Sequence, residues 1–580
     1  MSHMNEKSYG PVFPCVVLAA VCFICLAPFS NKAFHIDDTV FIWVARHIQF
    51  HPFDFYGFMA NWNGTVTAMS DIQKNPPLAS YYISLAAYLF GWSESAMHAA
   101  FLLPALAAAI GMYCLARELC VRPLEAALAG IVTPAFSLSA SSLMCDTMML
   151  SFWVWAVFFW VRGLKAQRAS FLGFSALLVT ASSLTKYSGM SLVPLLLVYS
   201  LVSKRGAGRW ILFLSLPVIL LAAYEWMTYA LYGKGLIPEA MSYAIGQQSF
   251  SGGDRTVRAL TGLEFTGGCL ITTFFYAPLL WRRGVLAAAA LLAILTMLCL
   301  PALHLLKAFP LFSAHGEKWP FVIQFTLFAF AGINVLALAA AELRREKSAE
   351  SVLLFLWVCG TFIFGSFLNW SVNGRSFLPM VPAAGILVMR RISGRTPSHS
   401  SKDFLHILPL VPALLLALWL NWSDYSLADS ARRATAEIRQ RYGNHEGTLW
   451  FLGHWGFQYY MEAIGAKAID FEKSTLVPGD RLVVPLNNTN IYSIKSDNSL
   501  GIIDELRYPS GRGLSTMDSS LGAGFYTDLW GPLPFAFGKT ADERYEIFLV
   551  LEKIQMPQAA QREAPASSRN EPAARSLKTE

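Results

Sequence analysis

Residues 11–42 read PVFPCVVLAAVCFICLAPFSNKAFHIDDTVFI, an uncharged apolar run up to residue 29 that is followed by two adjacent carboxylates, Asp37 and Asp38. An apolar stretch of about 20 residues is long enough to cross the hydrocarbon core of a bilayer as a helix. The whole chain shares this character: 55% of its 580 residues are hydrophobic and only 14% are charged, whereas soluble domains carry about 25% charged residues. The sequence therefore predicts a polytopic membrane protein and excludes a nucleic-acid-binding module.

Thirteen apolar runs, the first included, are candidates for membrane-spanning helices. We predict an α-helical polytopic membrane protein with about 13 transmembrane helices. The runs lie at residues 11–29, 96–116, 123–140, 147–161, 169–184, 187–202, 210–231, 263–281, 285–306, 320–341, 351–369, 376–389 and 404–422.

Lys and Arg residues follow a pattern that predicts the orientation. In membrane proteins the short cytoplasmic loops are enriched in these residues. With the N-terminus placed inside, every inside segment is basic, through Lys7, Arg117, Arg122, Arg162, Lys165, Arg168, Lys204, Arg205, Arg209, Arg282, Arg283, Arg344, Arg345, Lys347, Arg390, Arg391, Arg395 and Lys402. We therefore expect a multi-pass protein of the inner (cytoplasmic) membrane with its N-terminus inside and, because the number of spans is odd, its C-terminal domain outside.

Two long loops lie on the predicted outer side, at residues 30–95 and 232–262. In the first, apolar residues at helical spacing predict one helix over 37–49 and a second over 78–90. Their aromatic and apolar faces are typical of helices that lie in the membrane interface.

The composition becomes polar after residue 422. We expect a transmembrane domain over 10–422, a small extracytoplasmic α/β domain over 423–555 and a disordered tail over 556–580. In the α/β domain, capping residues and β-branched runs predict helices over 426–441 and 456–464 and strands over 448–452, 481–486 and 545–551.

Three carboxylates stand where the chain leaves apolar runs: Asp37 and Asp38 after the first, and Asp146 between the third and the fourth, in LMCDTMML. A carboxylate close to hydrocarbon is costly unless it is hydrogen-bonded, paired or bound to a metal, so all three are candidate catalytic residues. The alternative is that Asp37 or Asp38 caps the helix that begins there, and that Asp146 caps the fourth span.

Basic residues are few on the predicted outer side. Lys186 in SLTKYSG and Arg375 in NGRSFLP each lie at the outer end of a span, where a lipid phosphate is a natural partner for a cation. Snorkelling of these side chains to lipid headgroups is the alternative. Asp254 and Arg255, in the sequence SGGDR, belong either to a mobile loop over a substrate or to a surface turn.

His315 and Glu317 lie two residues apart in the short predicted outer loop HGEKW. An imidazole and a carboxylate at this spacing can bind a divalent metal ion. A polar loop without a metal is the alternative, and the sequence indicates no certain cofactor.

Several of these segments, in their order along the chain, resemble the GT-C glycosyltransferase superfamily. The likeness is to its bacterial branch, similar to protein O-mannosyltransferases and to the aminoarabinose transferase of lipid A, and it covers roughly residues 10–390. The segments are HIDDTVFIWVARHI (35–48), NPPLASYYISLAAYLFG (75–91), SLMCDTMML (142–150), SLTKYSG (183–189) and NGRSFLPMVPAAGILVMRR (373–391).

The resemblance implies a sugar donor linked to polyprenyl phosphate, an acceptor on the outer face and an inverting displacement. Asp37 matches the first acid of the family's acid pair, which acts as the base, whereas Asp38 stands where the family commonly has Glu. Asp146 matches the acid of the second outer loop. The resemblance also implies that the donor phosphate is bound by three basic residues, Lys74, Lys186 and Arg375. For Lys74, Asn75 intervenes before the proline motif.

We therefore expect an integral-membrane glycosyltransferase that acts at the outer face of the membrane. Its partners would be a polyprenyl-phosphate sugar donor, a lipid, glycan or protein acceptor and membrane lipids, but no nucleic acid. A polytopic transporter or flippase for lipids or lipid-linked sugars is the main alternative, although neither internal repeats nor charges in the middle of a span are present. A non-catalytic assembly subunit is the third possibility, and it requires that the acids be dispensable.

Overall fold

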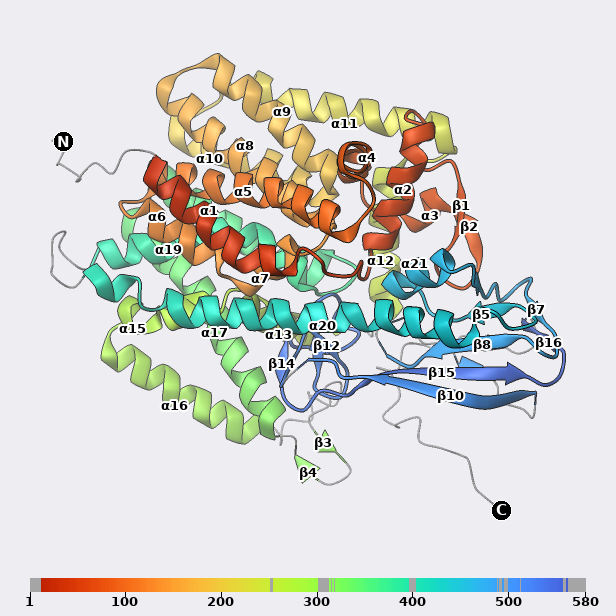
Figure 1. The fold of residues 1–580 in the computed structure, drawn as a ribbon. Helices are drawn as coiled ribbons and strands as arrows, with labels where there is room; N and C mark the ends of the chain where they lie inside the picture. Colours follow the sequence, from red (N-terminus) through yellow and green to blue (C-terminus); the bar gives the residue numbers. More distant parts are fainter. Residues whose placement is uncertain are drawn as a thin grey trace.

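The computed structural model describes residues 12–250, 254–300, 312–313, 316–317, 319–395, 403–487, 489, 493–494, 499–511, 513–556 and 560–561. Within these ranges the chain is mostly helical up to residue 442, and most strands follow residue 448 (Figure 1).

Seven of the described helical stretches are long and apolar enough to cross a membrane, or eight if a bent pair counts as one span. The bent pair is α6 (Pro123–Ile131) and α7 (Pro134–Ala140), which meet at 63°. Pro134 cannot donate a backbone hydrogen bond to continue α6, and Thr133 caps α7 instead. The seven are α1 (Val12–Leu26) with η1 (Ala27–Phe29), α5 (Glu94–Leu119), α8 (Asp146–Ala166), η2 (Tyr187–Ser191) with α10 (Leu192–Lys204), α11 (Ile211–Tyr232), α17 (Trp319–Glu346) and α18 (Ala349–Ile363) with η5 (Phe364–Leu368).

Four more of the predicted spans are shorter or interrupted within the described residues. α9 (Ala169–Thr185) and α16 (Arg283–Cys299) are apolar but shorter than the seven, and a 3₁₀ turn, η6 (Gly374–Met380), precedes α19 (Val381–Ser393). A single helix over 263–281 is wrong: the run is divided among α13 (Arg255–Cys269), α14 (Thr272–Phe275) and α15 (Ala277–Leu280). Pro278 explains the second break, between α14 and α15, because a proline cannot continue a helix from the preceding turn. The total of 13 spans stays a prediction.

The first long loop contains the two helices that the sequence predicts, α2 (Asp38–Phe50) and α4 (Leu78–Phe90). Between them, a hairpin of β1 (Met59–Asn61) and β2 (Val66–Ala68) leads into α3 (Met69–Ile72). The second loop contains α12 (Leu236–Phe250). In Figure 1, α2 and the hairpin lie on the same side of the molecule as the C-terminal strands.

A continuous helix of 33 residues, α20 (Leu410–Tyr442), runs from the helical part to the C-terminal strands (Figure 1). The helix predicted over 426–441 therefore begins earlier, because no proline or glycine interrupts it after Pro412. With α21 (Trp455–Ala463), its last turns share a buried core with the sheet, which includes Ala434, Ile438, Phe457 and Val483.

The C-terminal sheet has five strands in the order β10-β15-β8-β5-β6. The β5 strand is parallel to β6 and β8, and the other two pairs are antiparallel. The strands are β5 (Leu449–Phe451), β6 (Lys467–Ala468), β8 (Arg481–Pro485), β10 (Leu500–Tyr508) and β15 (Glu543–Val550). Two smaller pairs in the C-terminal region are β7 (Thr475–Leu476) with β16 (Ile554–Gln555) and β9 (Ser493–Ile494) with β17 (Ala560–Gln561). A third pair, β3 (Phe312–Ser313) with β4 (Gly316–Glu317), lies before α17 in the sequence. Helices and strands are thus combined here as predicted.

The segment between β10 and β15 packs on the membrane helices rather than on the sheet. It contains the pairs β11 (Leu514–Ser515) with β14 (Ala536–Phe537) and β12 (Met517–Asp518) with β13 (Ala523–Gly524). Phe525 and Phe535 are buried in the same hydrophobic cluster as the helices, and the Phe535 ring centroid lies 4.9 Å from that of Phe328 in α17. The C-terminal region therefore contributes to the core of the helical part.

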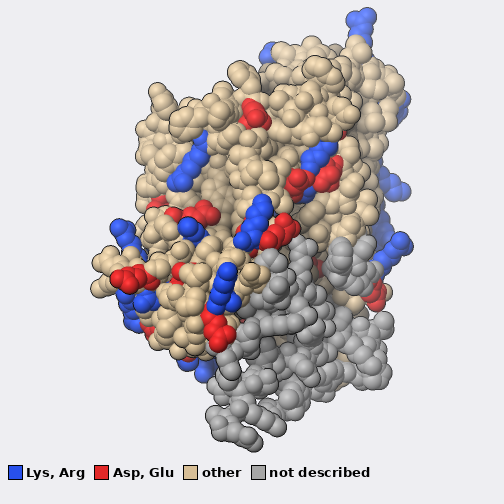
Figure 2. Space-filling view, turned by 90° about the vertical axis from the view of Figure 1, so that its right-hand side faces the viewer, with Lys and Arg blue, Asp and Glu red and all other residues tan. Residues whose placement is uncertain are grey.

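Large apolar side chains are exposed along the helices that can span a membrane, including Ile24, Leu212, Val218, Ile219 and Leu231. Figure 2 shows one face of the molecule, which is mostly uncharged in its upper part, with Lys and Arg close to Asp and Glu lower down. An apolar surface of this kind is stable in contact with lipid and not with water. The chain is a multi-pass membrane protein.

Candidate active site

The Asp37 carboxylate and the Arg375 guanidinium meet at the start of α2. Asp37 stands at the N-cap position of α2, but its side chain makes no capping hydrogen bond. Instead both terminal nitrogens of Arg375 donate to Asp37 Oδ2 at 3.4 Å. The capping alternative therefore does not describe Asp37, whose side chain keeps 37% of its surface exposed.

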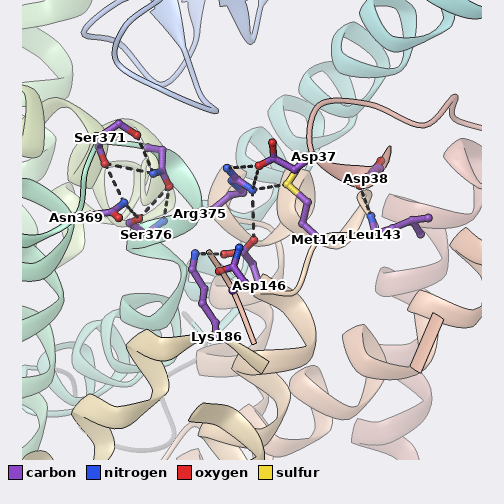
Figure 3. Close-up of polar contacts among 12 residues, drawn as sticks. Asp37, Asp38, Leu143, Met144, Asp146, Lys186, Asn369, Ser371, Arg375 and Ser376 are labelled. Carbon is purple, nitrogen blue, oxygen red and sulfur yellow. Dashed lines mark hydrogen bonds and ion pairs between the residues drawn. The ribbon is translucent and has the colours of Figure 1, made fainter. Parts of the chain in front are cut away.

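Asp146 joins Arg375 to Lys186 (Figure 3). It is the first residue of α8 and is completely buried. Lys186 Nζ, which follows the end of α9, donates to Asp146 Oδ1 at 2.5 Å, and Arg375 Nη1 lies 3.8 Å from Oδ2. Asp146 is not a helix cap, since Cys145 occupies that position and no side chain caps α8. A buried carboxylate is thus held between two cations, as a charge in apolar surroundings requires.

Lys186 and Arg375 face this acid rather than a lipid headgroup. Their side chains are only 18% and 12% exposed, so snorkelling does not describe either in this arrangement. Arg375 also contacts the sulfur of Met144. Its Nε is buried without a hydrogen-bond partner among the described residues, which leaves a donor free for a ligand.

Asp38 points away from this cluster (Figure 3). Its carboxylate is buried and accepts hydrogen bonds from the backbone amides of His35, at 3.0 Å, and Leu143, at 2.9 Å. Burial raises the pKa of Asp38 to about 7, although Lys32 and the two amides oppose this rise. Asp38 thus fastens the start of α2 to the loop that leads to Asp146.

Side chains of the 369–376 loop fix the backbone that carries Arg375. Asn373 Oδ1 accepts a hydrogen bond from the backbone amide of Ser376 at 3.0 Å and caps η6. Asn369 Nδ2 donates to the Ser376 hydroxyl at 2.8 Å and to the Ser371 carbonyl at 2.9 Å. The arginine therefore projects from a loop with few remaining degrees of freedom.

Lys74 lies outside the acid and cation cluster. Its amine donates to Glu239 of α12 at 2.8 Å and lies 5.2 Å from the ring centroid of Tyr243. Burial and then the charge of Asp37 raise the pKa of Tyr243. The predicted phosphate ligand is paired with another acid here.

Two further predicted residues, Asp254 and Arg255, lie at the start of α13. Asp254 caps α13 by accepting a hydrogen bond from the Thr256 amide at 2.7 Å, and Arg255 is exposed in the first turn. His315 lies outside the described residues, and of Glu317 only the backbone in β4 is described. Within the described parts of the chain, no three His, Cys, Asp or Glu side chains gather as a metal-ligand group.

Sequence reasoning missed the buried ion pair of Lys32 and Asp424, whose atoms Nζ and Oδ2 lie 2.5 Å apart, and the nearby Tyr526. Asp424 follows the apolar run 404–422 by two residues, so the argument from the cost of a carboxylate near hydrocarbon could have selected it. No sequence signal distinguishes Tyr526 from the other tyrosines.

A surface hollow of about 420 Å³ lies along α2 beyond the cluster. Trp43, Arg46 and His47 of α2 line one side, and Asn61 of β1 and Glu462 of α21 contribute polar groups. The first long loop and the C-terminal region therefore form this hollow together.

Residues 74–228 match the family model described as dolichyl-phosphate-mannose-protein mannosyltransferase. This match confirms the resemblance to the GT-C glycosyltransferases. Lys74, Asp146 and Lys186 lie inside the matched segment, and Asp37 and Arg375 lie outside it. A comparison with curated proteins finds no match.

The structure of the chain aligns with solved structures of three glycosyltransferases. An oligosaccharyltransferase from Archaeoglobus fulgidus, tethered to an acceptor peptide, is 13% identical with a TM-score of 0.46, over 80% of this chain and 64% of that one. ArnT from Cupriavidus metallidurans, bound to undecaprenyl phosphate, is 15% identical with a TM-score of 0.39, over 84% and 96%. The arabinofuranosyltransferase AftD from Mycobacteria is 13% identical with a TM-score of 0.40, over 95% and 40%. The chain thus spans less than two thirds of the length of the oligosaccharyltransferase and of AftD.

Proposed function

We propose that this protein is an integral-membrane glycosyltransferase that transfers a sugar, with inversion, from a polyprenyl-phosphate-linked donor to an acceptor hydroxyl. The observation that carries the proposal is the cluster of two acids and two cations, Asp37, Asp146, Lys186 and Arg375, from four separate segments of a membrane protein. Such a set supplies both a base for the acceptor and positive charge for a leaving phosphate.

Asp37 is the proposed base. Its side chain is 37% exposed, whereas Asp38 and Asp146 are completely buried and engaged by backbone amides and by cations. A hydroxyl is a poor nucleophile near neutral pH, and a positioned carboxylate that takes its proton contributes roughly 10²- to 10⁴-fold to the rate. The hydroxyl oxygen then bonds to the anomeric carbon from the face opposite the phosphate, whose bond to that carbon breaks.

Lys186 and Arg375 are the proposed ligands of the departing phosphate, and Asp146 holds them together. The electron pair of the broken bond stays on the phosphate oxygen, so negative charge grows there during the reaction. Arg375 retains an unpaired Nε within the described structure, and an ammonium such as that of Lys186 has three donors. Lys74 would join them only after leaving Glu239.

The hollow along α2 is the proposed site for the acceptor. Trp43 lies six residues beyond Asp37 on α2, which corresponds to about 9 Å along a helix axis. A volume of about 420 Å³ is within the range of small-molecule sites, and its mixture of aromatic and polar side chains suits a polar acceptor.

The proposed location is the inner (cytoplasmic) membrane, with the cluster and the C-terminal region on the outer side. The basic segments around Arg117, Arg162, Lys204, Arg344 and Arg390 support this orientation. A donor carried by a lipid fits such a site, because the lipid tail stays in the bilayer while its phosphate reaches the surface.

Mass spectrometry of envelope lipids, glycans and proteins, with and without the gene, tests the function. We expect one class of glycosylated molecule to disappear on deletion and to return with the parent gene but not with Asp37→Asn. In proteoliposomes the purified protein should release one polyprenyl phosphate for each sugar transferred, which a flippase would not do. An unchanged glycan profile in the deletion strain would contradict the proposal.

A further inference from the structure

The loop that carries Arg375 is paired with a distant segment of the C-terminal region. The backbone amide of Gly374 donates to the Phe525 carbonyl at 2.7 Å, and the amide of Asp528 donates to the Val372 carbonyl at 2.9 Å. The Asp528 side chain returns a bond by accepting from the Val372 amide at 3.1 Å. Val372 and Phe525 both belong to the hydrophobic core of the helical part.

Tyr526 lies between these bonds and faces the cation. The Arg375 guanidinium carbon is 5.8 Å from the centroid of the Tyr526 ring, within the range of a cation–π contact. The tyrosine is 3% exposed, so its ring is fixed by packing. The ring thus limits the directions in which the guanidinium can turn.

Asp424 holds the phenol of Tyr526. The Tyr526 hydroxyl donates to Asp424 Oδ2 at 2.7 Å, and the Thr516 hydroxyl donates to Oδ1 at 2.7 Å. Lys32 also contacts Oδ2, at 2.5 Å, and donates to the Ser141 carbonyl at 3.3 Å. Burial alone would raise the pKa of Asp424, but Lys32 and the hydrogen bonds lower it, so the carboxylate is anionic and fully bonded.

We propose that Tyr526 is a positioning residue for the transfer reaction, and that the Lys32–Asp424 pair holds it in place. Through Tyr526 the C-terminal region orients the Arg375 guanidinium toward Asp37 and Asp146. The inference rests on the proposed function and assigns the C-terminal region a part in catalysis without contact with the reacting atoms. If Tyr526 only joined the two parts of the chain, it would stabilise the fold and have no effect on turnover.

The test compares Tyr526→Phe and Tyr526→Leu with the control Tyr508→Phe. Tyr508 is a matched control, since its hydroxyl also donates to an acid, Glu437, and its ring lies 5.3 Å from the Arg433 guanidinium carbon. It differs from Tyr526 in its location, because it belongs to the C-terminal sheet. The full chain in lipid nanodiscs is assayed for turnover at saturating donor, for binding of undecaprenyl phosphate and for thermal unfolding.

We expect Tyr526→Leu to lower turnover at least tenfold. Tyr526→Phe keeps the ring and should lower turnover by a smaller factor. Both should weaken binding of the lipid phosphate, and Tyr508→Phe should change neither quantity. Turnover and binding within twofold of the parent in both Tyr526 variants, whatever their unfolding temperatures, would overturn the inference. If the parent itself transfers no sugar, the proposed function fails and the inference falls with it, whereas an active parent with equally active variants rejects the inference alone.

Discussion

The Arg375 guanidinium lies 3.4 Å from the Asp37 carboxylate, although 338 positions separate the two residues in the sequence. In the proposed mechanism the same cation binds the donor phosphate. Arrival of the phosphate would therefore draw the guanidinium from Asp37 and leave this carboxylate free to accept a proton from the acceptor hydroxyl. The contact links donor binding to the release of the base.

Removing either cation of the cluster should impair both the binding and the reaction of the donor. We expect Lys186→Met and Arg375→Met to weaken binding of a polyprenyl-phosphate donor and to slow turnover at saturation at least tenfold, because each variant loses charge opposite the leaving oxygen. Lys165→Met is the control, since Lys165 is 42% exposed and pairs with Glu118 and Glu350. Changes within about twofold, or about 0.4 kcal/mol, in both quantities would show that the two cations do not share a phosphate site.

Asp38→Asn should mainly lower the stability of the fold rather than impair the transfer reaction directly. An amide oxygen and an amide nitrogen cannot accept hydrogen bonds from both His35 and Leu143, so one buried backbone amide loses its partner at a cost of about 1–3 kcal/mol. Thermal unfolding in detergent measures this loss, with Asp71→Asn as a control at a half-exposed acid. Unchanged unfolding together with lost turnover would instead assign Asp38 to the reaction.

Glu543 in β15 gives the C-terminal region a predictable pH dependence. Burial raises the pKa of Glu543 to about 8, so the folded chain binds a proton that the unfolded chain releases near pH 4.5. The stabilisation is complete below pH 4.5 and is lost as the pH rises to about 8, by at most about 1.4 kcal/mol per pH unit. We expect Glu543→Gln to flatten the pH dependence of thermal unfolding in this window. A parallel profile for parent and variant would show that Glu543 ionises normally.

Orientation can be tested with cysteines at four exposed positions. A membrane-impermeant maleimide should label Met241→Cys and Ile502→Cys in intact cells but reach Ala207→Cys and Glu346→Cys only after permeabilisation. All four sites are exposed to solvent in the structure, so burial does not limit labelling. Parent labelling is subtracted because nine native cysteines are present. Protection of position 502 in intact cells would reverse the orientation.

Local structure was predictable where the pattern is local. The apolar period of residues 78–90 coincides with α4 (Leu78–Phe90), and the strands β5 and β8 lie within the stretches predicted for them. The break between α14 and α15 was missed because mean apolarity does not register Pro278. The prediction divided α20 into a span and a separate helix because its polarity changes along its length, while its backbone stays helical.

The three acids were predictable as candidates, but their separate roles were not. Asp37 and Asp38 are neighbours in the sequence, yet one residue turns a helix by about 100°, so one carboxylate meets Arg375 and the other meets two backbone amides. Likewise, the pairing of Lys186 and Arg375 with Asp146, and of Lys74 with Glu239, depends on how distant segments pack. Tyr526 was missed because its position against Arg375 exists only in the folded chain.

The role of Asp37 as the base is tested most directly by Asp37→Asn in nanodiscs, with donor binding and single-turnover transfer measured on the same preparation. The substitution removes the proton acceptor and keeps the volume of the side chain. We predict that the variant binds the donor within about threefold of the parent, while transfer falls by about two orders of magnitude or more. Asp71→Asn should match the parent in both measurements. Transfer by Asp37→Asn at the parent's rate would contradict the proposal that Asp37 takes the acceptor's proton.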